Sequence, residues 1–417
     1  MSDRLHIQVR RLPVDPGAAG TPLVELAGQR VSLTSLRRVP ERFSSLFGAA
    51  KAGVGYGLCL CSTPPLRLVI RAGKGRYHLA GWPGEGDQHA TGCDFHKLLQ
   101  VSGRSAYTAG AIEETEQGTR VRLAVPLHLR SGRAAAARTP PPDLDSVPSA
   151  TRRSVGLLGL LHLVWQDAGL SEWREPGQCR TWVDCHRALS HEVATCAVSD
   201  VPLSAVLHLV PPYRPETARA TALAFDRFCG ELGTSGRTTR RGLILGEIRL
   251  IEPTPYGYRI ALRHQRTPVF SDAQLLDRVA RSYRAAFSAS LPEQSRRIVL
   301  AVVERTGRGY LRVVDMVAML TNAQYLPAES SHEVRLTDHL VAAGRAFVKP
   351  LRYEAGAAVF PDFILVDVDP RVYVEVYGVQ GQQAYEDHKR DKRAYYAAAG
   401  IPVLEWEVGD PLPDLPG

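Results

Sequence analysis

Apolar residues recur with either helical or strand spacing along the chain, and the two periods divide it into segments. From Val155 to Ala168 the pattern VGLLGLLHLVWQDA has helical spacing and stops before Gly169, which readily adopts the left-handed cap conformation. Further helices are expected at about 181–197 and 215–232. The period then becomes that of strands, because GLILGEIRLIE and YRIALRH, joined by the turn PTPYG, predict a hairpin.

These patterns predict several domains. Residues 1–130 mix short apolar runs with glycine and proline, which indicates a β-rich domain, and the proline-rich segment 131–153 is expected to be a linker. Helices followed by a hairpin over 154–270 indicate a winged-helix-like domain, although a small helical domain packed on an unrelated hairpin has the same order. Residues 271–325 are expected to be a helix and hairpin that connect to the last domain.

The last domain, 326–417, has the clearest order of elements. It predicts a helix over HEVRLTDHLVAAG, three strands over FVKPLRY, VFPDFILVD and VYVEVYG, a helix from about Gln383 to Ala399 and a final strand, PVLEWEV, in the order αβββαβ. The turn between the second and third strands is short, so Asp362 and Glu375 should lie at neighbouring strand ends. Converging carboxylates suit Mg²⁺ or Mn²⁺, which can activate water against a phosphodiester.

Composition sets outer limits on location and partners. A chain of 417 residues is too long for one core, so we expect a multidomain α+β protein. Lysine and arginine outnumber aspartate and glutamate by 51 to 43, which favours polyanionic partners. No run is apolar and long enough for a signal peptide or a membrane span, so we expect a cytoplasmic protein without a membrane partner. Seven cysteines in such a chain argue against a disulfide framework and leave metal binding as a role for some.

A metal site is predicted near the N-terminus. Cys59 and Cys61 lie on an expected strand, and Cys93 follows with His89 four residues before it and His96 three after it. These spacings suit tetrahedral Zn²⁺ held by two knuckles, in a structural site with no open position. His89 is preferred because the loop GEGDQHATGC can curl back onto the metal, and His96 is the alternative. The simpler interpretation is buried cysteines beside surface histidines.

A basic hairpin is predicted between these two regions. Residues 237–266 hold seven arginines against two glutamates, interleaved with Tyr256 and Tyr258. Such a surface could follow a phosphate backbone, but solvated strand faces have the same composition. Nothing in the segment indicates that a base sequence is recognised. The arginines expected to contact nucleic acid are Arg237, Arg240, Arg241, Arg259 and Arg263.

The C-terminal domain resembles the PD-(D/E)XK nucleases, especially the branch that includes very-short-patch-repair endonucleases. The resemblance implies a restriction-endonuclease-like fold and a Mg²⁺-dependent endonuclease that hydrolyses DNA. It also implies a glutamate on the first helix that tunes or completes the site. Five features agree in order, and they are Glu333, Asp362-Phe363, Glu375 to Gly378, Lys389 to Arg393, and Val403 to Trp406.

One position departs from that family's motif. The motif has a lysine two residues after its glutamate, where this chain has Tyr377. Lys389 and Lys392 are three residues apart on the next helix and share a face, and some branches of the family place the working lysine there. One of the two is expected to orient the attacking water and offset charge in the transition state. The expected catalytic set is Glu333, Asp362, Glu375, Lys389 and Lys392, in which Asp362 and Glu375 hold the metal.

The chain also resembles, from about residue 50 to its end, an uncharacterised bacterial family of unknown function carried on conjugative and integrative elements. The segments are GYGLCLC, YHLAGWPGEGDQHATGC, LLHLVWQDAGL, FVKPLRYEAGAAVFPDF and EVYG. This implies a setting in mobile DNA, with DNA, other mobile-element proteins or a second copy as partners. The alternative to a nuclease is a non-catalytic nucleic-acid-binding or assembly protein that keeps the fold, which Tyr377 favours. A regulator that binds an operator through the middle domain is a third possibility.

Overall fold

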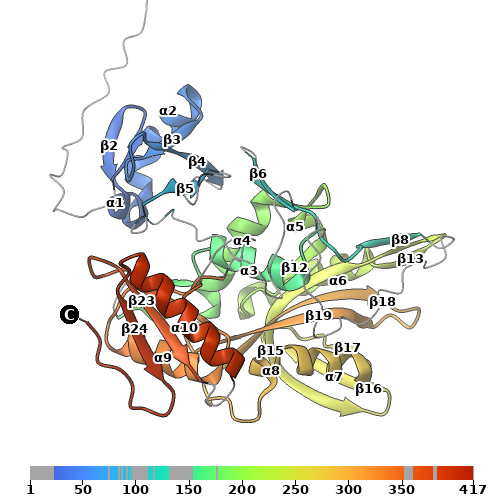
Figure 1. Cartoon of the computed structure of the whole chain (residues 1–417). Helices are drawn as coiled ribbons and strands as arrows, with labels where there is room; N and C mark the ends of the chain where they lie inside the picture. Colours follow the sequence, from blue (N-terminus) through green and yellow to red (C-terminus); the bar gives the residue numbers. More distant parts are fainter. Residues whose placement is uncertain are drawn as a thin grey trace, which may run out of the picture. The chain divides into compact units, whose positions relative to one another are not determined.

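The structure is a computed structural model with mixed α/β architecture and several sheets (Figure 1). It divides into two compact units, Met1–Lys97 and Leu98–Gly417. None of the helices in the described part of the chain is both long and apolar enough to cross a membrane. The residues described are 23–73, 76–82, 85, 88–90, 93, 95, 111–115, 118–130, 154–174, 177–351, 360–378 and 383–416.

The first unit contains a five-stranded antiparallel sheet in the order β2-β1-β3-β4-β5. Its elements are β1 (Leu23–Leu26), β2 (Gln29–Ser32), α1 (Leu33–Arg38), a 3₁₀ turn (Pro40–Phe43), α2 (Ser44–Gly53), β3 (Tyr56–Cys59), β4 (Leu66–Gly73) and β5 (Arg76–Gly81). Alternate strand residues such as Leu26 and Leu68 pack with Phe47 of α2 in one buried cluster. The predicted β-rich region is therefore present over the described residues of this unit.

The second unit is built around a seven-stranded sheet in the order β12-β15-β16-β17-β19-β18, with β20 beside β19. Because β15 also pairs with β18, five of these strands form a closed ring of pairings. One buried cluster joins Ile244, Ile260 and Val299 of the ring to Leu275 of helix α7 (Ala273–Ser282). The strands are β12 (Leu207–Leu209), β15 (Gly242–Thr254), β16 (Gly257–Leu262), β17 (Val269–Ser271), β18 (Arg296–Arg305), β19 (Leu311–Thr321) and β20 (Pro327–Ala328).

This sheet differs from the predicted winged-helix-like domain and connector. The hairpins expected in 154–270 and 271–325 are parts of one sheet, in which β15 lies between β16 and β18. The physical reason is burial on both faces. Leu243 and Leu245 of β15 belong to one core, and Ile244 belongs to another, as is typical of a central strand rather than of a wing.

The first domain boundary also differs from the prediction. Strand β8 (His128–Arg130) pairs with β14 (Thr238–Arg240), which pairs with β13 (Gly233–Ser235). Residues 111–130 thus belong to the second unit, because they pair with its strands, and the boundary follows Lys97 instead of residue 130. The predicted linker 131–153 lies outside the described residues. The remaining paired strands are β6 (Ile112–Thr115), β7 (Gly118–Val121), β10 (Cys196–Val198) and β11 (Val201–Pro202).

The expected helices of the middle region are present. Helix α3 ends next to Gly169, whose φ of 70° is the left-handed conformation predicted for it. Helix α4 begins with a capping box between Thr181 and Asp184. The helices are α3 (Leu157–Asp167), α4 (Trp182–Thr195), α5 (Leu203–Val206), a 3₁₀ turn (Pro215–Thr217), α6 (Ala218–Gly230) and α8 (Arg284–Phe287).

The C-terminal elements follow the predicted order αβββαβ. They are α9 (Ser331–Ala342), β21 (Phe347–Val348), β22 (Phe363–Leu365), β23 (Val372–Tyr377), α10 (Gln383–Ala398) and β24 (Val403–Glu407). Their sheet has the order β24-β23-β22-β21-β9, in which only β23 and β24 are parallel. Strand β9 (Glu172–Trp173) comes from the middle region, and Trp173 pairs with Phe347. This sheet is therefore completed by a segment outside the predicted C-terminal domain.

Candidate functional site

The carboxylate of Asp362 is fixed by the pairing of β22 with β23. Asp362 comes directly before β22, and its N–H donates to the carbonyl of Val374 at 3.1 Å. Its Oδ2 accepts the N–H of Val376 at 2.8 Å. Its side chain is 22% exposed. Asp362 is thus held rigidly while it keeps access to solvent.

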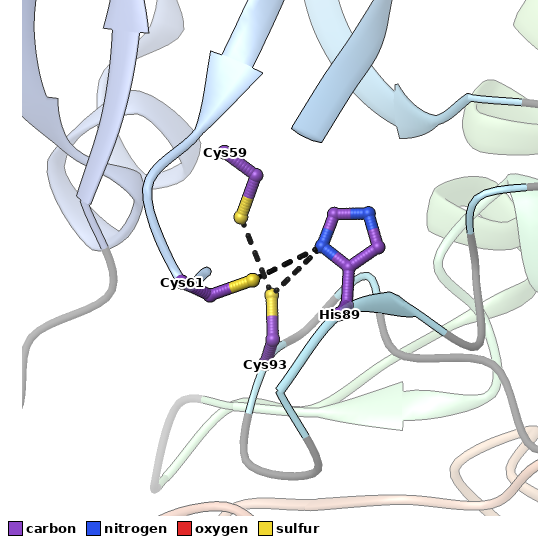
Figure 2. Close-up of side chains that lie close together, drawn as sticks. All are labelled: Cys59, Cys61, His89 and Cys93. Carbon is purple, nitrogen blue, oxygen red and sulfur yellow. Dashed lines mark hydrogen bonds between the residues drawn. The ribbon is translucent and has the colours of Figure 1, made fainter. Parts of the chain in front are cut away.

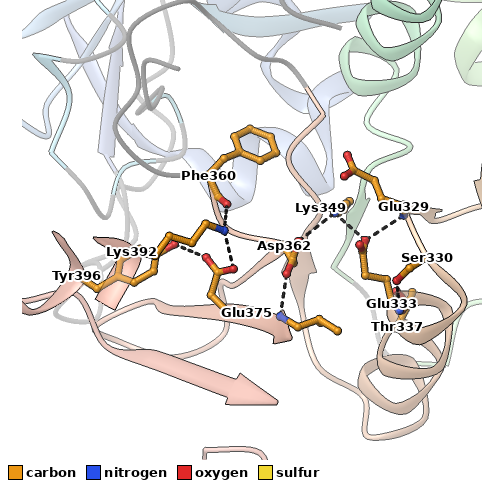
Figure 3. A network of polar contacts seen from close by, with 11 residues as sticks. Glu329, Ser330, Glu333, Thr337, Lys349, Phe360, Asp362, Glu375, Lys392 and Tyr396 are labelled. Atoms are coloured by element: carbon orange, nitrogen blue, oxygen red, sulfur yellow. Dashed lines mark hydrogen bonds and ion pairs between the residues drawn. The ribbon is translucent and has the colours of Figure 1, made fainter. Parts of the chain in front are cut away.

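Glu375 lies on β23 and is only 1% exposed. Its Oε2 is 2.8 Å from Nζ of Lys392, and its Oε1 accepts the hydroxyl of Tyr396, both from α10 (Figure 3). Burial raises the pKa of Glu375 to about 7, and the negative charge of Asp362 adds to the rise. The positive charge of Lys392 has the opposite, smaller effect. Asp362 is therefore close enough for its charge to affect Glu375, as the short turn between their strands predicted.

Glu333 lies in the first turn of α9, where the hydroxyl of Ser330 accepts its N–H. Its Oε2 accepts the N–H of Glu329 at 3.0 Å and lies 2.7 Å from Nζ of Lys349. Burial raises the pKa of Glu333 to about 7 against the opposing charge of Lys349, and Asp362 adds to the rise. Glu333 is thus joined to the predicted pair through Lys349.

Lys349 is the member of this cluster that sequence analysis did not predict. It follows β21, is 1% exposed, and its Nζ lies 3.9 Å from Oδ1 of Asp362. A signal for it is present in the sequence. Phe347, Lys349 and Leu351 alternate, all three are buried, and residues two apart on a strand point to the same face.

The two lysines predicted on α10 have different positions. Lys392 reaches Glu375, whereas Lys389 pairs with Glu407 of β24 and lies over the ring of Tyr377, 4.4 Å from its centroid. Tyr377 is 4% exposed, and burial raises the pKa of its phenol. The tyrosine therefore fills its position as a neutral, packed side chain.

Two lysines contact the acidic residues of the cluster. Within the described residues, Glu333, Asp362 and Glu375 do not form a group whose oxygens all lie within 4.8 Å of one another. Lys349 lies between the first two, and Lys392 contacts the third. The two lysines thus lie at opposite ends of the Asp362 and Glu375 pair, and Asp362 is the most exposed of the three carboxylates.

A second cluster lies in the first unit and joins Cys59, Cys61, His89 and Cys93 (Figure 2). Their sulfur and nitrogen atoms all lie within 4.8 Å of one another. Nδ1 of His89 is 3.2 Å from Sγ of Cys61 and 3.5 Å from Sγ of Cys93. These four residues could hold a metal ion. They are the predicted set, and the alternative ligand, His96, lies outside the described residues.

The surroundings of these thiols suit a bound cation. Cys59 ends β3 and is buried, and Cys93 accepts the N–H of Phe95 at 3.5 Å. A hydrogen bond with Cys59 raises the pKa of Cys93 to about 12, together with burial. A metal ion would offset this rise because coordination favours the thiolate. All seven cysteines of the chain are free thiols in this structure.

The five predicted arginines do not form one uniform surface. Arg241 pairs with Glu304 at 3.1 Å, and Arg263 pairs with buried Glu247 at 2.8 Å. The others are Arg259, which pairs with Glu252, and the exposed Arg237 and Arg240 on the β13–β14 hairpin. Pairing with carboxylates therefore reduces the positive charge that Arg241, Arg259 and Arg263 offer to a polyanion.

Comparison with models of protein families matches residues 30–409 to the family described as Protein of unknown function (DUF1173). No curated protein and no solved structure matches the chain. The predicted membership of a family of unknown function is thereby confirmed.

Proposed function

The chain belongs to the DUF1173 family, and we propose that it is a metal-dependent nuclease that hydrolyses phosphodiester bonds in DNA of mobile elements. The observation that carries this proposal is the contact of Lys392 with Glu375 beside Asp362. It places a positive charge from α10 next to the two carboxylates that were expected to hold a metal. The order of the C-terminal elements supports it as well.

Each residue has a chemical role in this proposal. Asp362 and Glu375 offer the hard oxygen donors that Mg²⁺ or Mn²⁺ prefers. A bound divalent cation would polarise the phosphodiester and lower the pKa of a water molecule. Lys392 would orient that water and offset the negative charge that develops on the phosphate. Tyr396 holds the second oxygen of Glu375 and so fixes the carboxylate's direction.

The cysteine and histidine cluster would hold Zn²⁺ in a structural role. Three thiolates and one imidazole make a common tetrahedral zinc set, and four protein ligands leave no position open for chemistry. The N–H of Phe95 directed at Sγ of Cys93 is the kind of outer contact that orients a ligating sulfur. The metal would then stabilise the first unit, in which three of the four ligands are buried.

Cleavage assays test the nuclease proposal directly. The purified chain is incubated with plasmid and with single-stranded DNA in Mg²⁺ or Mn²⁺, beside Glu375→Gln and Asp362→Asn. Each variant is expected to lose activity by at least about 100-fold, because each removes a metal ligand. Glu386→Gln, an exposed carboxylate on α10, is the matched control and should cleave normally. Equal nicking by wild type and both variants, or none by any, would reject the catalytic role.

The second candidate function is a non-catalytic DNA-binding or assembly protein of a mobile element. Tyr377 favours it, because a buried neutral ring stands where the nuclease motif has its lysine. Binding of DNA without metal-dependent cleavage, unaffected by Glu375→Gln, is the result that would support this alternative.

A further inference from the structure

Lys349 lies inside the carboxylate cluster and has little freedom to leave it. Its Nζ is 2.7 Å from Oε2 of Glu333 and 3.9 Å from Oδ1 of Asp362 (Figure 3). It also lies 5.2 Å from the ring centroid of Phe363. Its backbone is fixed too, because its N–H donates to the carbonyl of Ser171 at 2.8 Å, next to β9. With 1% of its surface exposed, the ammonium is an internal part of the protein.

A cation in this position restricts how many metal ions the site can take. In two-metal sites the ions lie about 3.5–4 Å apart and share carboxylate oxygens. Here the place between Glu333 and Asp362 is already taken by an ammonium. A second divalent cation would have to share the same oxygens with Lys349, and like charges at such separations repel strongly where water is excluded.

Glu333 and Glu375 differ in how they could meet a metal. Oε2 of Glu333 is engaged by Lys349 and by the N–H of Glu329, and both contacts are short. Glu375 faces Lys392, whose side chain is 14% exposed and therefore has a path to move aside. Asp362, at 22% exposed, is next to both. The accessible pair is thus Asp362 with Glu375.

We propose that Lys349 is a fixed internal cation that takes the place of one metal ion. The site then binds a single divalent cation through Asp362 and Glu375, and Glu333 anchors Lys349 instead of ligating metal. This inference rests on the proposed function for the presence of the divalent cation. Lys349 acts as a positioning residue, because it holds Asp362 and Glu333 and has no contact with substrate in this scheme.

Titration with Mn²⁺, followed by electron paramagnetic resonance and calorimetry on the full zinc-containing chain, tests the stoichiometry without any activity measurement. Wild type is expected to bind one Mn²⁺ at this site, and Asp362→Asn and Glu375→Gln are each expected to lose it. The double variant Glu333→Gln/Lys349→Met keeps the buried pair neutral and should bind one Mn²⁺ within about threefold of the wild-type affinity.

Lys349→Met alone leaves Glu333 and Asp362 without their cation and is expected to bind a second Mn²⁺. If this variant does not fold, the double variant still decides the question, because it loses Mn²⁺ only if Glu333 is a ligand. Two Mn²⁺ in wild type, loss of Mn²⁺ from the folded double variant, or a folded Lys349→Met with unchanged binding would each overturn the inference. Absence of any Mn²⁺ binding by wild type would instead remove the proposed function, and the inference with it.

Discussion

Lys392 and Glu375 are 17 residues apart in sequence, and Nζ of the lysine lies 2.8 Å from Oε2 of the glutamate. The same Nζ donates to the carbonyl of Phe360 at 2.9 Å, two residues before Asp362. One lysine on α10 therefore ties together the ends of β22 and β23 that carry the two carboxylates. A lysine at position 377 would approach Glu375 along its own strand, whereas Lys392 approaches it from a helix.

Replacing Lys392 should separate its role from that of Lys389. Lys392→Met is expected to lower DNA cleavage on the order of 100-fold, because it removes the cation beside Glu375. Lys389→Met should retain most of the activity, since Lys389 pairs with Glu407 on β24. Cleavage rates at saturating Mg²⁺ measure both effects. A larger loss for Lys389→Met would mean that the wrong lysine has been assigned.

The contrast between these residues indicates how far the sequence could predict the site. Asp362 and Glu375 were predictable because a short turn forces their strands to pair. Helical spacing put Lys389 and Lys392 on one face, but it does not specify which of them reaches Glu375. Lys349 was missed because it lies just after the two-residue strand β21 and its partner Glu333 comes from another element.

The zinc proposal predicts a specific loss. Cys59→Ser should release the metal and lower the melting temperature of the first unit, because folding of that unit is coupled to binding. Metal content by mass spectrometry and thermal unfolding measure the two effects. Cys179→Ser is the matched control, since Cys179 is an exposed thiol in the second unit. Wild-type protein purified without zinc, or equal zinc in both variants, would contradict the assignment.

The arginines should contribute unequally to DNA binding. Arg240→Gln is expected to reduce the slope of log affinity against log salt by about 1, because it removes one phosphate contact of an exposed arginine on β14. Arg241→Gln should leave the slope unchanged, since Arg241 already pairs with Glu304 at 3.1 Å. Fluorescence anisotropy without added Mg²⁺ or Mn²⁺, where cleavage is suppressed, provides the measurement. Equal slopes for both variants would exclude Arg240 as a contact.

The C-terminal domain should not fold alone, although its order of elements was predicted correctly. Trp173 is 1% exposed and packs with Phe347, Phe363 and Trp406 in one core. Loss of a buried tryptophan costs about 3–5 kcal/mol, a large share of a domain's stability. A fragment of residues 326–417 lacks β9 and is expected to be unfolded by circular dichroism, whereas 98–417 should be folded. A cooperative melt of the shorter fragment would contradict this.

The two-residue strand β9 also explains why the C-terminal sheet extends beyond the predicted domain. Glu172 and Trp173 have no periodicity that could identify a strand, and their partner Phe347 is far away in sequence. The closed ring of strands has the same origin, because the pairing of β15 with β18 joins residues such as Leu245 and Leu300. Local patterns predict the elements, while such distant pairings determine which elements share a core.

Stability should depend on pH through His162, which is buried in α3. Burial lowers the pKa of His162 to about 4, and the charge of Lys349 lowers it further. Glu329 and the Leu351 carbonyl, which accepts the N–H of His162, have the opposite effect on this pKa. Between pH 6.5 and 4 the unfolded chain therefore binds a proton that the folded chain does not. The contribution of neutral His162 to the free energy of unfolding, at most about 3 kcal/mol, is complete above pH 6.5. It is lost as the pH falls to 4.

Glu333 and Glu375 have the opposite effect on stability, because their pKa values are raised in the folded state. Their protonated forms stabilise the fold at low pH, and this stabilisation is lost as the pH rises from 4.5 to about 7. The difference between wild type and His162→Gln isolates the histidine, since glutamine can still donate to the Leu351 carbonyl. Urea unfolding of both proteins from pH 4 to 8 should show wild type gaining stability relative to the variant as pH rises through this window. A constant difference across the range would mean that His162 is protonated equally in both states, and that its burial does not control acid stability.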